Sequence, residues 1–389
     1  MTQTDTRLQP YSNVPEHHFK MPVEDLIGFC AEAKRVEEGG KINVIQRAFL
    51  TDSDSNQFYI ILGQISKIFL SNYMKENRFS ESHIGNCLIV IDNKNEADVY
   101  INVPTVMQIV AKRRIDSGSP VTKEDIADIR KIEFPGLSIE SYCGIFYIFS
   151  VGWRRGLYFD LASLGKLKIK RDFKTLETLF ASFHAYITFP EVLKLTENIK
   201  NELMDLGWFP FIRILGKRFE ELCENKKNDF PMNEISLKII ESFDSISIRK
   251  MCDSWMSKDE FKKHEKIIRK GIEEYIEGDF ISSIHILYPR IEGIIRLMCI
   301  NESNYNLKST DLAKKIESAA KAKDGLNLYL PEDFNRYLSK FYFANFNLSQ
   351  ERVPLSRNSL AHGVANAEDF DKIKAFQGLM ILDQIFFYL

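Results

Sequence analysis

The sequence predicts an α+β N-terminal region followed by a mainly helical remainder. Between about residues 40 and 170, short runs of β-branched and aromatic residues are separated by Asn, Asp, Gly and Pro, which is typical of strands. From about residue 172, apolar residues recur every three or four positions, the period of an amphipathic helix. The length of 389 residues favours two or three domains.

Four segments are expected from these patterns. Residues 1–20 are polar and predict a flexible start. Residues 21–171 predict a strand-rich α+β domain, and residues 172–256 a helical connecting region. Residues 257–389 predict a helical bundle.

Composition excludes several classes of protein. A hydrophobic fraction of 44% with 29 Phe is ample for sizeable cores, so disorder is not expected. The formal net charge of −2 excludes a globally basic, histone-like binder but allows a local basic surface. The six cysteines form no CxxC pair, so we expect buried thiols and neither a zinc site nor a disulfide framework.

The first twenty residues have no apolar core, and no later run is apolar for about 18 residues. Neither a signal peptide nor a membrane segment is therefore expected. The interpretation is a reduced, cytoplasmic protein with no membrane partner, no cofactor and no bound metal.

Four runs are candidates for strands in the first domain: residues 57–70, 86–93, 97–110 and 142–153. The polar stretch "DNKNEAD" at 92–98 predicts a hairpin connection. Some of these runs could instead be buried helix, because periodicity does not separate the two over short apolar stretches.

Two basic stretches leave alternatives open. Arg154 and Arg155, between glycines and aromatics, could contact RNA by stacking or could be solvated arginines of a β-hairpin. The alternating lysines of "KLKIKR" at 166–171 could meet phosphates, but the favoured interpretation is protection of an exposed strand edge.

Helix starts can be predicted along the second half of the chain. His184 lies in an aromatic stripe and is interpreted as a core residue. Ser257 with Glu260 predicts a capping box. Pro289 inside an apolar helical pattern predicts a kink.

The last helices also carry start signals. Ser309 or Thr310 is the expected cap of one helix, and Pro331 predicts the first turn of the next. Asn366 is expected to cap the C-terminal helix.

The stretch "RNSLAHG" at 357–363 combines residue types that suit phosphodiester chemistry. On a straight helix, Arg357 and His362 would lie about 140° apart around the axis. Gly363 and the cap at Asn366 indicate that the helix ends here, which allows both side chains to turn toward one point.

A metal-free cleavage of RNA can be built from these side chains. RNA carries its own nucleophile, the 2′-hydroxyl, so the protein need only move protons and stabilise charge. His362 could act as general base or acid near neutral pH. Arg357 could hold phosphate oxygens, while Asn358 could orient the histidine or donate to phosphate.

"RNSLAHG" resembles the Arg-x4-His motif of the HEPN superfamily, with the usual polar residue after the Arg. "LYPRIEGIIR" at 287–296 is similar to an earlier helix of the RNxxxHG branch of that superfamily. The resemblance covers about 257–389 and implies a four- or five-helix HEPN-like bundle. It also implies a homodimer in which two motifs face each other across a two-fold axis.

The resemblance implies catalytic roles for Arg357 and His362, support from Asn358, and an acidic position near the motif at Glu292. It implies a metal-independent endoribonuclease that acts as a toxin or anti-phage (abortive infection) effector on an RNA substrate. The N-terminal domain would then bind an inhibitory or trigger partner. For the residues, the alternatives are that Arg357 caps a helix end or pairs with Glu292, and that His362 merely ends the helix. For the whole bundle, the alternative is a non-catalytic module for dimerisation, partner binding or nucleotide binding.

Overall fold

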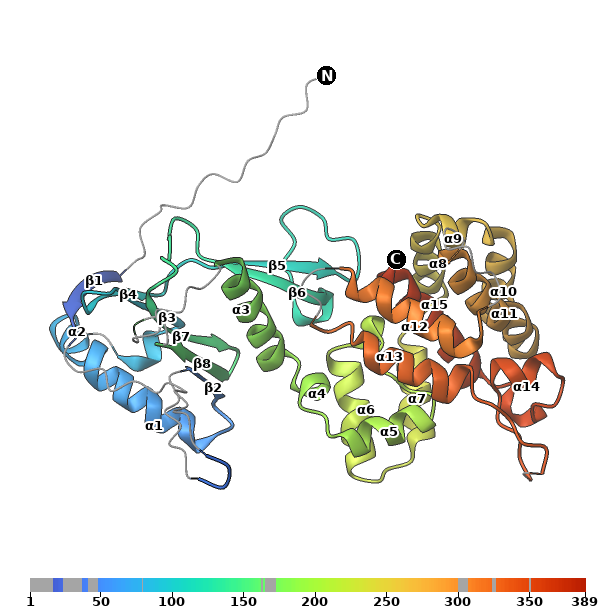
Figure 1. Cartoon of the computed structure of the whole chain (residues 1–389). Coiled ribbons are helices and arrows are strands. Elements are labelled where there is room, and N and C mark those ends of the chain that lie inside the picture. The colour runs from blue at the N-terminus through green and yellow to red at the C-terminus, as the bar shows by residue number, and fades with distance from the viewer. Residues whose placement is uncertain are drawn as a thin grey trace, which may run out of the picture. The chain divides into compact units, whose positions relative to one another are not determined.

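The computed structural model describes residues 17–23, 37–40, 48–78, 80–161, 164, 173–299, 307–323, 327–349 and 351–389 (Figure 1). The chain divides into two compact units. The sheet unit comprises Met1–Gln108 and Arg130–Thr188, and the helical unit comprises Ile109–Ile129 and Phe189–Leu389. The N-terminal antiparallel sheet and the following helices agree with the coarse fold class that the sequence predicts.

The sheet unit is built on six antiparallel strands in the order β1-β4-β3-β7-β8-β2. The strands are β1 His17–Pro22, β2 Ala48–Asp52, β3 Asn86–Ile91, β4 Glu96–Ile101, β7 Gly144–Val151 and β8 Arg154–Asp160. The hairpin predicted at 92–98 is confirmed, since Ile91 pairs with Ala97 across a turn in which Asn95 has a φ of 63°.

Residues 57–70, a predicted strand, are helical. Helix α1 (Asn56–Ile65) leads into a π-helical turn (Ser66–Leu70) and helix α2 (Ser71–Glu76). Ser55 caps α1 by accepting a hydrogen bond from the Gln57 N–H. The buried residues of this segment recur at helical spacing and face the sheet, while their neighbours are exposed. The segment is therefore a helix and not a strand, because its apolar residues follow the helical period.

Alternate residues of β7 are buried on opposite faces of the sheet. Phe146 and Ile148 belong to the apolar cluster beneath α1. Tyr147 and Phe149 point the other way, toward α3 (Phe173–Thr188), with ring centroids 4.7 Å from Phe180 and 5.0 Å from Phe183 respectively. Both faces of the central strand are therefore covered by helix, which explains its near-continuous hydrophobic sequence.

His184 on α3 is a core residue, as the sequence predicts. It is 6% exposed, its ring stacks on Phe149 at 3.8 Å, and its Nε2 lies 2.9 Å from the Tyr147 hydroxyl. Burial lowers the pKa of His184 to about 3, so the imidazole is neutral in the folded protein.

Strand β1 corrects the expectation of a flexible start for residues 17–20 only, because residues 1–16 lie outside the described residues. His17 to Lys20 belong to a strand that pairs with β4, and His18 Nε2 lies 2.7 Å from Asp98 Oδ1. Backbone pairing with β4 orders a segment whose own composition is polar.

The two basic stretches have different outcomes. Arg154 and Arg155 lie at a β7–β8 hairpin, where the Arg154 guanidinium lies over the Trp153 ring at 4.5 Å. Residues 166–171 lie outside the described residues, so no structural statement tests their lysines.

The helical unit is organised around the C-terminal helix α15 (Lys372–Tyr388), which is buried on all sides. It contacts α7, α8, α11 and α12. The helices before it are α4 Pro190–Leu193, α5 Glu197–Asp205, α6 Lys217–Lys227, α7 Met232–Glu241, α8 Ser245–Trp255, α9 Asp259–Lys262, α10 Glu265–Glu277, α11 Phe280–Met298, α12 Ser309–Lys321, α13 Pro331–Tyr337 and α14 Arg357–Ala361. A π-helical turn at Leu338–Tyr342 follows α13, and strands β5 (Val106–Ala111) and β6 (Ile126–Glu133) form a separate pair.

A buried carboxylate joins segments far apart in the sequence. Asp383 on α15, 1% exposed, accepts hydrogen bonds from Arg213 Nε at 3.0 Å and Nη2 at 2.7 Å, and from Trp255 Nε1 at 2.9 Å. The helices expected as a connecting region over 172–256 therefore do not form a unit of their own. Those after Thr188 share one core with 257–389, and α3 belongs to the sheet unit.

The predicted capping box at Ser257 is wrong. Lys258 precedes α9, and the Ser257 hydroxyl instead donates to the Ser254 carbonyl at 2.8 Å. The chain turns again at His264 before α10. Phe261, fully buried 5.7 Å from the Trp255 ring, holds this short helix, and local capping signals do not encode such a tertiary contact.

The other helix starts fall within a few residues of their predicted positions. Lys308 precedes α12 without a side-chain cap, so neither Ser309 nor Thr310 is the cap. Pro331 begins α13, which confirms that prediction. Asn366 precedes only a 3-10 turn (Ala367–Asp369), and Asp371 caps α15 by accepting from the Lys374 N–H at 2.7 Å. Helix α11 continues through Pro289 as one element.

Five of the six cysteines lie among the described residues, and all five are buried thiols. Burial raises the pKa of Cys87 and of Cys223 to about 12, which disfavours the reactive thiolate. Cys30 lies outside the described residues. Over the described part of the chain, none of the helices has the length and apolar character needed to cross a membrane.

Candidate functional site

The candidate site begins with the short helix α14. Ser356 and Ser359 form a reciprocal capping box: the Ser356 hydroxyl accepts the Ser359 N–H at 3.1 Å, and the Ser359 hydroxyl accepts the Ser356 N–H at 2.8 Å. His362 ends the helix, and Gly363 follows with a left-handed φ of +66°. The helix end that the sequence predicts at Gly363 is present.

Glu292 on α11 lies between two guanidinium groups. Arg357 Nε forms an ion pair with Glu292 Oε2, and Arg296 Nη2 lies 2.7 Å from Oε1. The Glu292 side chain is 10% exposed, whereas those of Arg357 and Arg296 are 35% and 40% exposed. The carboxylate therefore fixes the inner edge of the Arg357 guanidinium and leaves part of it accessible.

Glu292 is itself held by a chain of hydrogen bonds. Its backbone N–H donates to the Tyr342 hydroxyl at 3.2 Å, and that hydroxyl donates to the Tyr288 carbonyl at 2.6 Å. Burial raises the pKa of Tyr342 well above its ordinary value, so the phenol keeps the proton that it donates. The Tyr342 contact links α11 to the π-helical turn that precedes the loop to α14.

Asn358 connects α14 to that same loop. Its Nδ2 donates to the Phe343 carbonyl at 3.0 Å and to the Ala344 carbonyl at 3.3 Å. Its Oδ1 accepts a long bond of 3.4 Å from Arg357 Nη1. The amide is thus committed to backbone positions, which suits a supporting role and not direct donation to a phosphate.

The His362 side chain is exposed on the turn that ends α14. Its ring centroid lies 5.3 Å from that of Phe346, and its backbone N–H donates to the Asn358 carbonyl at 3.1 Å. The imidazole has no hydrogen-bond partner among the residues that the structure describes. Both ring nitrogens are therefore open to a ligand.

The structure brings three of the four predicted residues into contact. Arg357 touches Glu292 and Asn358, whereas no contact within the described ranges joins the His362 imidazole to any of them. The site so defined offers a permanent positive charge held by a carboxylate, and an exposed imidazole beside it on the same short helix. Over the same ranges, no cluster of three or more His, Cys, Asp or Glu side chains is placed to hold a metal ion.

Sequence reasoning missed three residues that build this site. Arg296 shares the carboxylate, Tyr342 anchors it, and Ser356 starts α14. The Glu292–Arg296 pair has i,i+4 spacing, which the sequence alone could have revealed. Ser356 and Ser359 are likewise visible as a capping pattern, while the Tyr342 contact depends on tertiary packing.

Comparisons with known proteins identify no relative. No protein-family model matches the chain, and no match was found among curated proteins or among solved structures. The resemblance to an Arg-x4-His motif therefore depends on residues 357–363 and 287–296 of the sequence alone.

Proposed function

We propose that the helical unit is a metal-independent endoribonuclease in which Arg357 and His362 carry the chemistry. The observation that supports this most is the exposed, unengaged imidazole at the end of a helix whose first residue is an arginine held by Glu292. The proposed biological role is that of a toxin or anti-phage effector, in which the sheet unit receives an inhibitory or trigger partner.

The proposed reaction is an attack of the RNA 2′-hydroxyl on the adjacent phosphorus. The bond from phosphorus to the 5′-oxygen of the next nucleotide breaks, which leaves a 2′,3′-cyclic phosphate and a 5′-hydroxyl. His362 takes or gives the proton, and Arg357 stabilises the negative charge that develops on the phosphate oxygens. Glu292 holds the Arg357 guanidinium through Nε, and Nη1 of Arg357 donates only a long bond of 3.4 Å to Asn358, so the terminal nitrogens are not committed to a carboxylate.

This chemistry favours two copies of the chain. The reaction needs a base for the 2′-hydroxyl and an acid for the leaving oxygen, and the exposed site of one chain supplies a single imidazole. A two-fold dimer would supply the second. We expect light scattering to give a dimer, and specific cleavage activity to fall on dilution as the dimer dissociates.

RNA cleavage in the presence of EDTA tests the proposed activity. The wild type should release fragments with 2′,3′-cyclic phosphate ends, and His362→Ala and Arg357→Ala should lose cleavage while they keep their circular dichroism. His285→Ala and Arg249→Ala are matched controls, because His285 is another exposed histidine of the bundle and Arg249 another surface arginine paired with a glutamate. Intact RNA with the wild type, or equal loss in the controls, would count against the proposal.

The second candidate is a non-catalytic module for dimerisation, partner binding or nucleotide binding. The favouring observation is that Arg357 and Asn358 already have structural contacts, with Glu292 and with backbone carbonyls. Growth of cells that express the wild type or Arg357→Ala separates the candidates. Equal growth, with dimerisation retained by both proteins, supports the module.

A further inference from the structure

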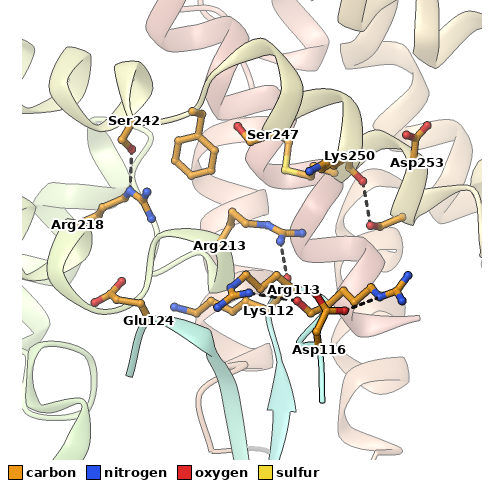
Figure 2. Close-up of a pocket in the computed structure, with 14 residues that line it drawn as sticks. Lys112, Arg113, Asp116, Glu124, Arg213, Arg218, Ser242, Ser247, Lys250 and Asp253 are labelled. Carbon is orange, nitrogen blue, oxygen red and sulfur yellow. Dashed lines mark hydrogen bonds and ion pairs between the residues drawn. The ribbon is translucent and has the colours of Figure 1, made fainter. Parts of the chain in front are cut away.

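A cavity of about 910 Å³ lies within the helical unit (Figure 2), and no residue of α14 lines it. It lies between the segment that contains Lys112 and Glu124 and the helices α6 and α8. Its volume falls in the range of small-molecule sites, about 300–1,000 Å³. The lining residues are Lys112, Arg113, Arg114, Asp116, Glu124, Arg213, Arg218, Ser242, Phe243, Ser247, Lys250, Met251, Asp253 and Ser254.

The lining carries an excess of positive charge, with six cations and three carboxylates, in a chain whose net charge is −2. All three carboxylates have partners. Asp116 pairs with Arg114 at 3.3 Å, and Asp253 pairs with Arg269 outside the cavity at 2.7 Å. Glu124 accepts the Lys217 N–H at the start of α6 at 2.9 Å.

Three of the cations have no carboxylate partner among the described residues: Lys112, Arg218 and Lys250. Arg218 donates through Nε to the Ser242 hydroxyl at 2.7 Å, and Lys250 is exposed on α8. Figure 2 shows Arg218 and Lys250 above the level of Lys112, with Arg213 between them. Their charges can therefore act on a ligand without first breaking an ion pair.

Lys112 is the unusual member of this set, because it is only 6% exposed. Its Nζ donates to the Leu215 carbonyl at 2.7 Å. The pKa of Lys112 is lowered to about 8, mainly by burial; the Glu124 and Glu191 charges oppose this shift, and the nearby Arg218 and Arg213 charges add to it. The two carboxylates offset only part of the cost of a buried ammonium beside two guanidiniums, and a bound anion would add a further counter-charge.

The floor of the cavity is rigidly held. Arg213 donates through Nη1 to the Lys112 carbonyl at 2.5 Å, while its other nitrogens are fixed by the buried Asp383. Arg213 and Lys112 are thus placed before any ligand arrives, which reduces the ordering cost of binding.

The lining also contains apolar side chains, which an inorganic anion would not need. These are Phe243 and the buried Met251, and the Arg218 guanidinium lies 4.9 Å from the Phe243 ring centroid. A ligand that fits both features carries phosphates at one end and an aromatic ring at the other.

We propose that this cavity binds a nucleotide, with its phosphates on Lys112, Arg218 and Lys250 and its base against Phe243 and Met251. The site is independent of the proposed ribonuclease activity, because none of its lining residues belongs to the α14 site.

Isothermal titration calorimetry of the full chain with ATP tests the proposal. We expect one saturable site per chain, and a dissociation constant raised about tenfold or more by Lys250→Ala or Arg218→Ala. Lys250→Arg should keep most of the affinity. Arg249→Ala removes the same charge from the neighbouring position of α8, outside the lining, and should bind ATP like the wild type.

Two further ligands, inorganic triphosphate and adenosine, test the phosphate end and the base end of the nucleotide separately. Phe243→Ala should weaken ATP while it leaves inorganic triphosphate unchanged, and adenosine alone should bind much more weakly than ATP. Circular dichroism checks the fold of each variant. Lys250 is exposed, so Lys250→Ala carries the test if Arg218→Ala does not fold.

Three outcomes would overturn the proposal. One is the absence of heat with ATP up to roughly 1 mM, which corresponds to a binding free energy weaker than about −4 kcal/mol. Another is equal weakening by Arg249→Ala, which would indicate a diffuse surface charge. The third is a single-stranded RNA that binds through Lys250 and is not displaced by ATP, which would assign the surface to a polynucleotide backbone.

Discussion

Replacement of Glu292 by Gln removes one negative charge from between Arg296 and Arg357 and keeps the shape of the side chain. The carboxylate forms two charge-assisted contacts and is 10% exposed, and its loss leaves two guanidiniums without their partner. Each hydrogen bond to a charged group contributes about 1.5–3 kcal/mol when well buried. Because both arginines are more than a third exposed, solvent screening reduces each contribution to about 1 kcal/mol.

We therefore expect Glu292→Gln to lower the free energy of unfolding of the helical unit by about 2 kcal/mol. For a unit of this size, that corresponds to a melting temperature about 4–8 °C lower. Thermal or urea unfolding followed by circular dichroism at 222 nm measures the change. Glu265→Gln is the matched control: its carboxylate also forms an i,i+4 pair with an arginine on the bundle, but the pair is exposed and should contribute at most about 0.5 kcal/mol.

Cleavage by the same variant distinguishes the two roles of Glu292. A carboxylate that positions Arg357 should reduce stability and activity together when it is lost. Full stability with abolished cleavage would instead make Glu292 a catalytic residue. A stability loss no greater than that of Glu265→Gln would refute the reasoning, because it would show that the carboxylate does not hold the two arginines.

Three further predictions concern stability. Burial lowers the pKa of His184 to about 3 in the native state. As the pH falls below about 6.5, this histidine takes up a proton in the unfolded chain but not in the native protein, so the free energy of unfolding decreases toward acid pH. Between pH 7 and pH 5 this should amount to about 2 kcal/mol in urea titrations, and an equal slope in His184→Phe would contradict it. Asp383→Asn should lower the free energy of unfolding by about 3–5 kcal/mol in the same assay, because it leaves Arg213 without its counter-charge. A decrease of less than about 1 kcal/mol would show that the carboxylate does not hold the core. Gly363→Ala should lower the free energy of unfolding by about 1–2 kcal/mol. The φ of +66° is the only cause, because an added Cβ meets no atom within 4 Å. An unchanged melting temperature would show that the turn relaxes.

Local signals were sufficient where neighbouring residues decide the structure. The hairpin at 92–98 follows from its turn residues, and Pro331 begins a helix because its fixed φ suits a first turn. The end of α14 at Gly363 follows from the left-handed conformation that glycine adopts without a Cβ penalty. At these points the sequence by itself determined the backbone.

Tertiary contacts decided the rest. Residues 57–70 are helical because one face packs on a sheet, and Ser257 caps nothing because Phe261 is buried against Trp255. At the cavity, Lys112 donates a hydrogen bond to the carbonyl of Leu215, which lies 103 residues away in the sequence. In the helical core, Arg213 pairs with Asp383, which lies 170 residues away. No local pattern encodes such pairs.

The motif at 357–363 shows the same division. From the sequence alone, the arginine and the histidine of this motif are expected to lie at the end of a helix. The ion pair of Arg357 with Glu292 was one of the alternatives that the sequence left open, and the folded chain shows it. Only the folded chain places the Asn358 amide on backbone carbonyls and leaves His362 exposed. The physical reason is that the partners of a side chain depend on which elements pack beside it, and α11 and α14 meet only after the bundle has formed.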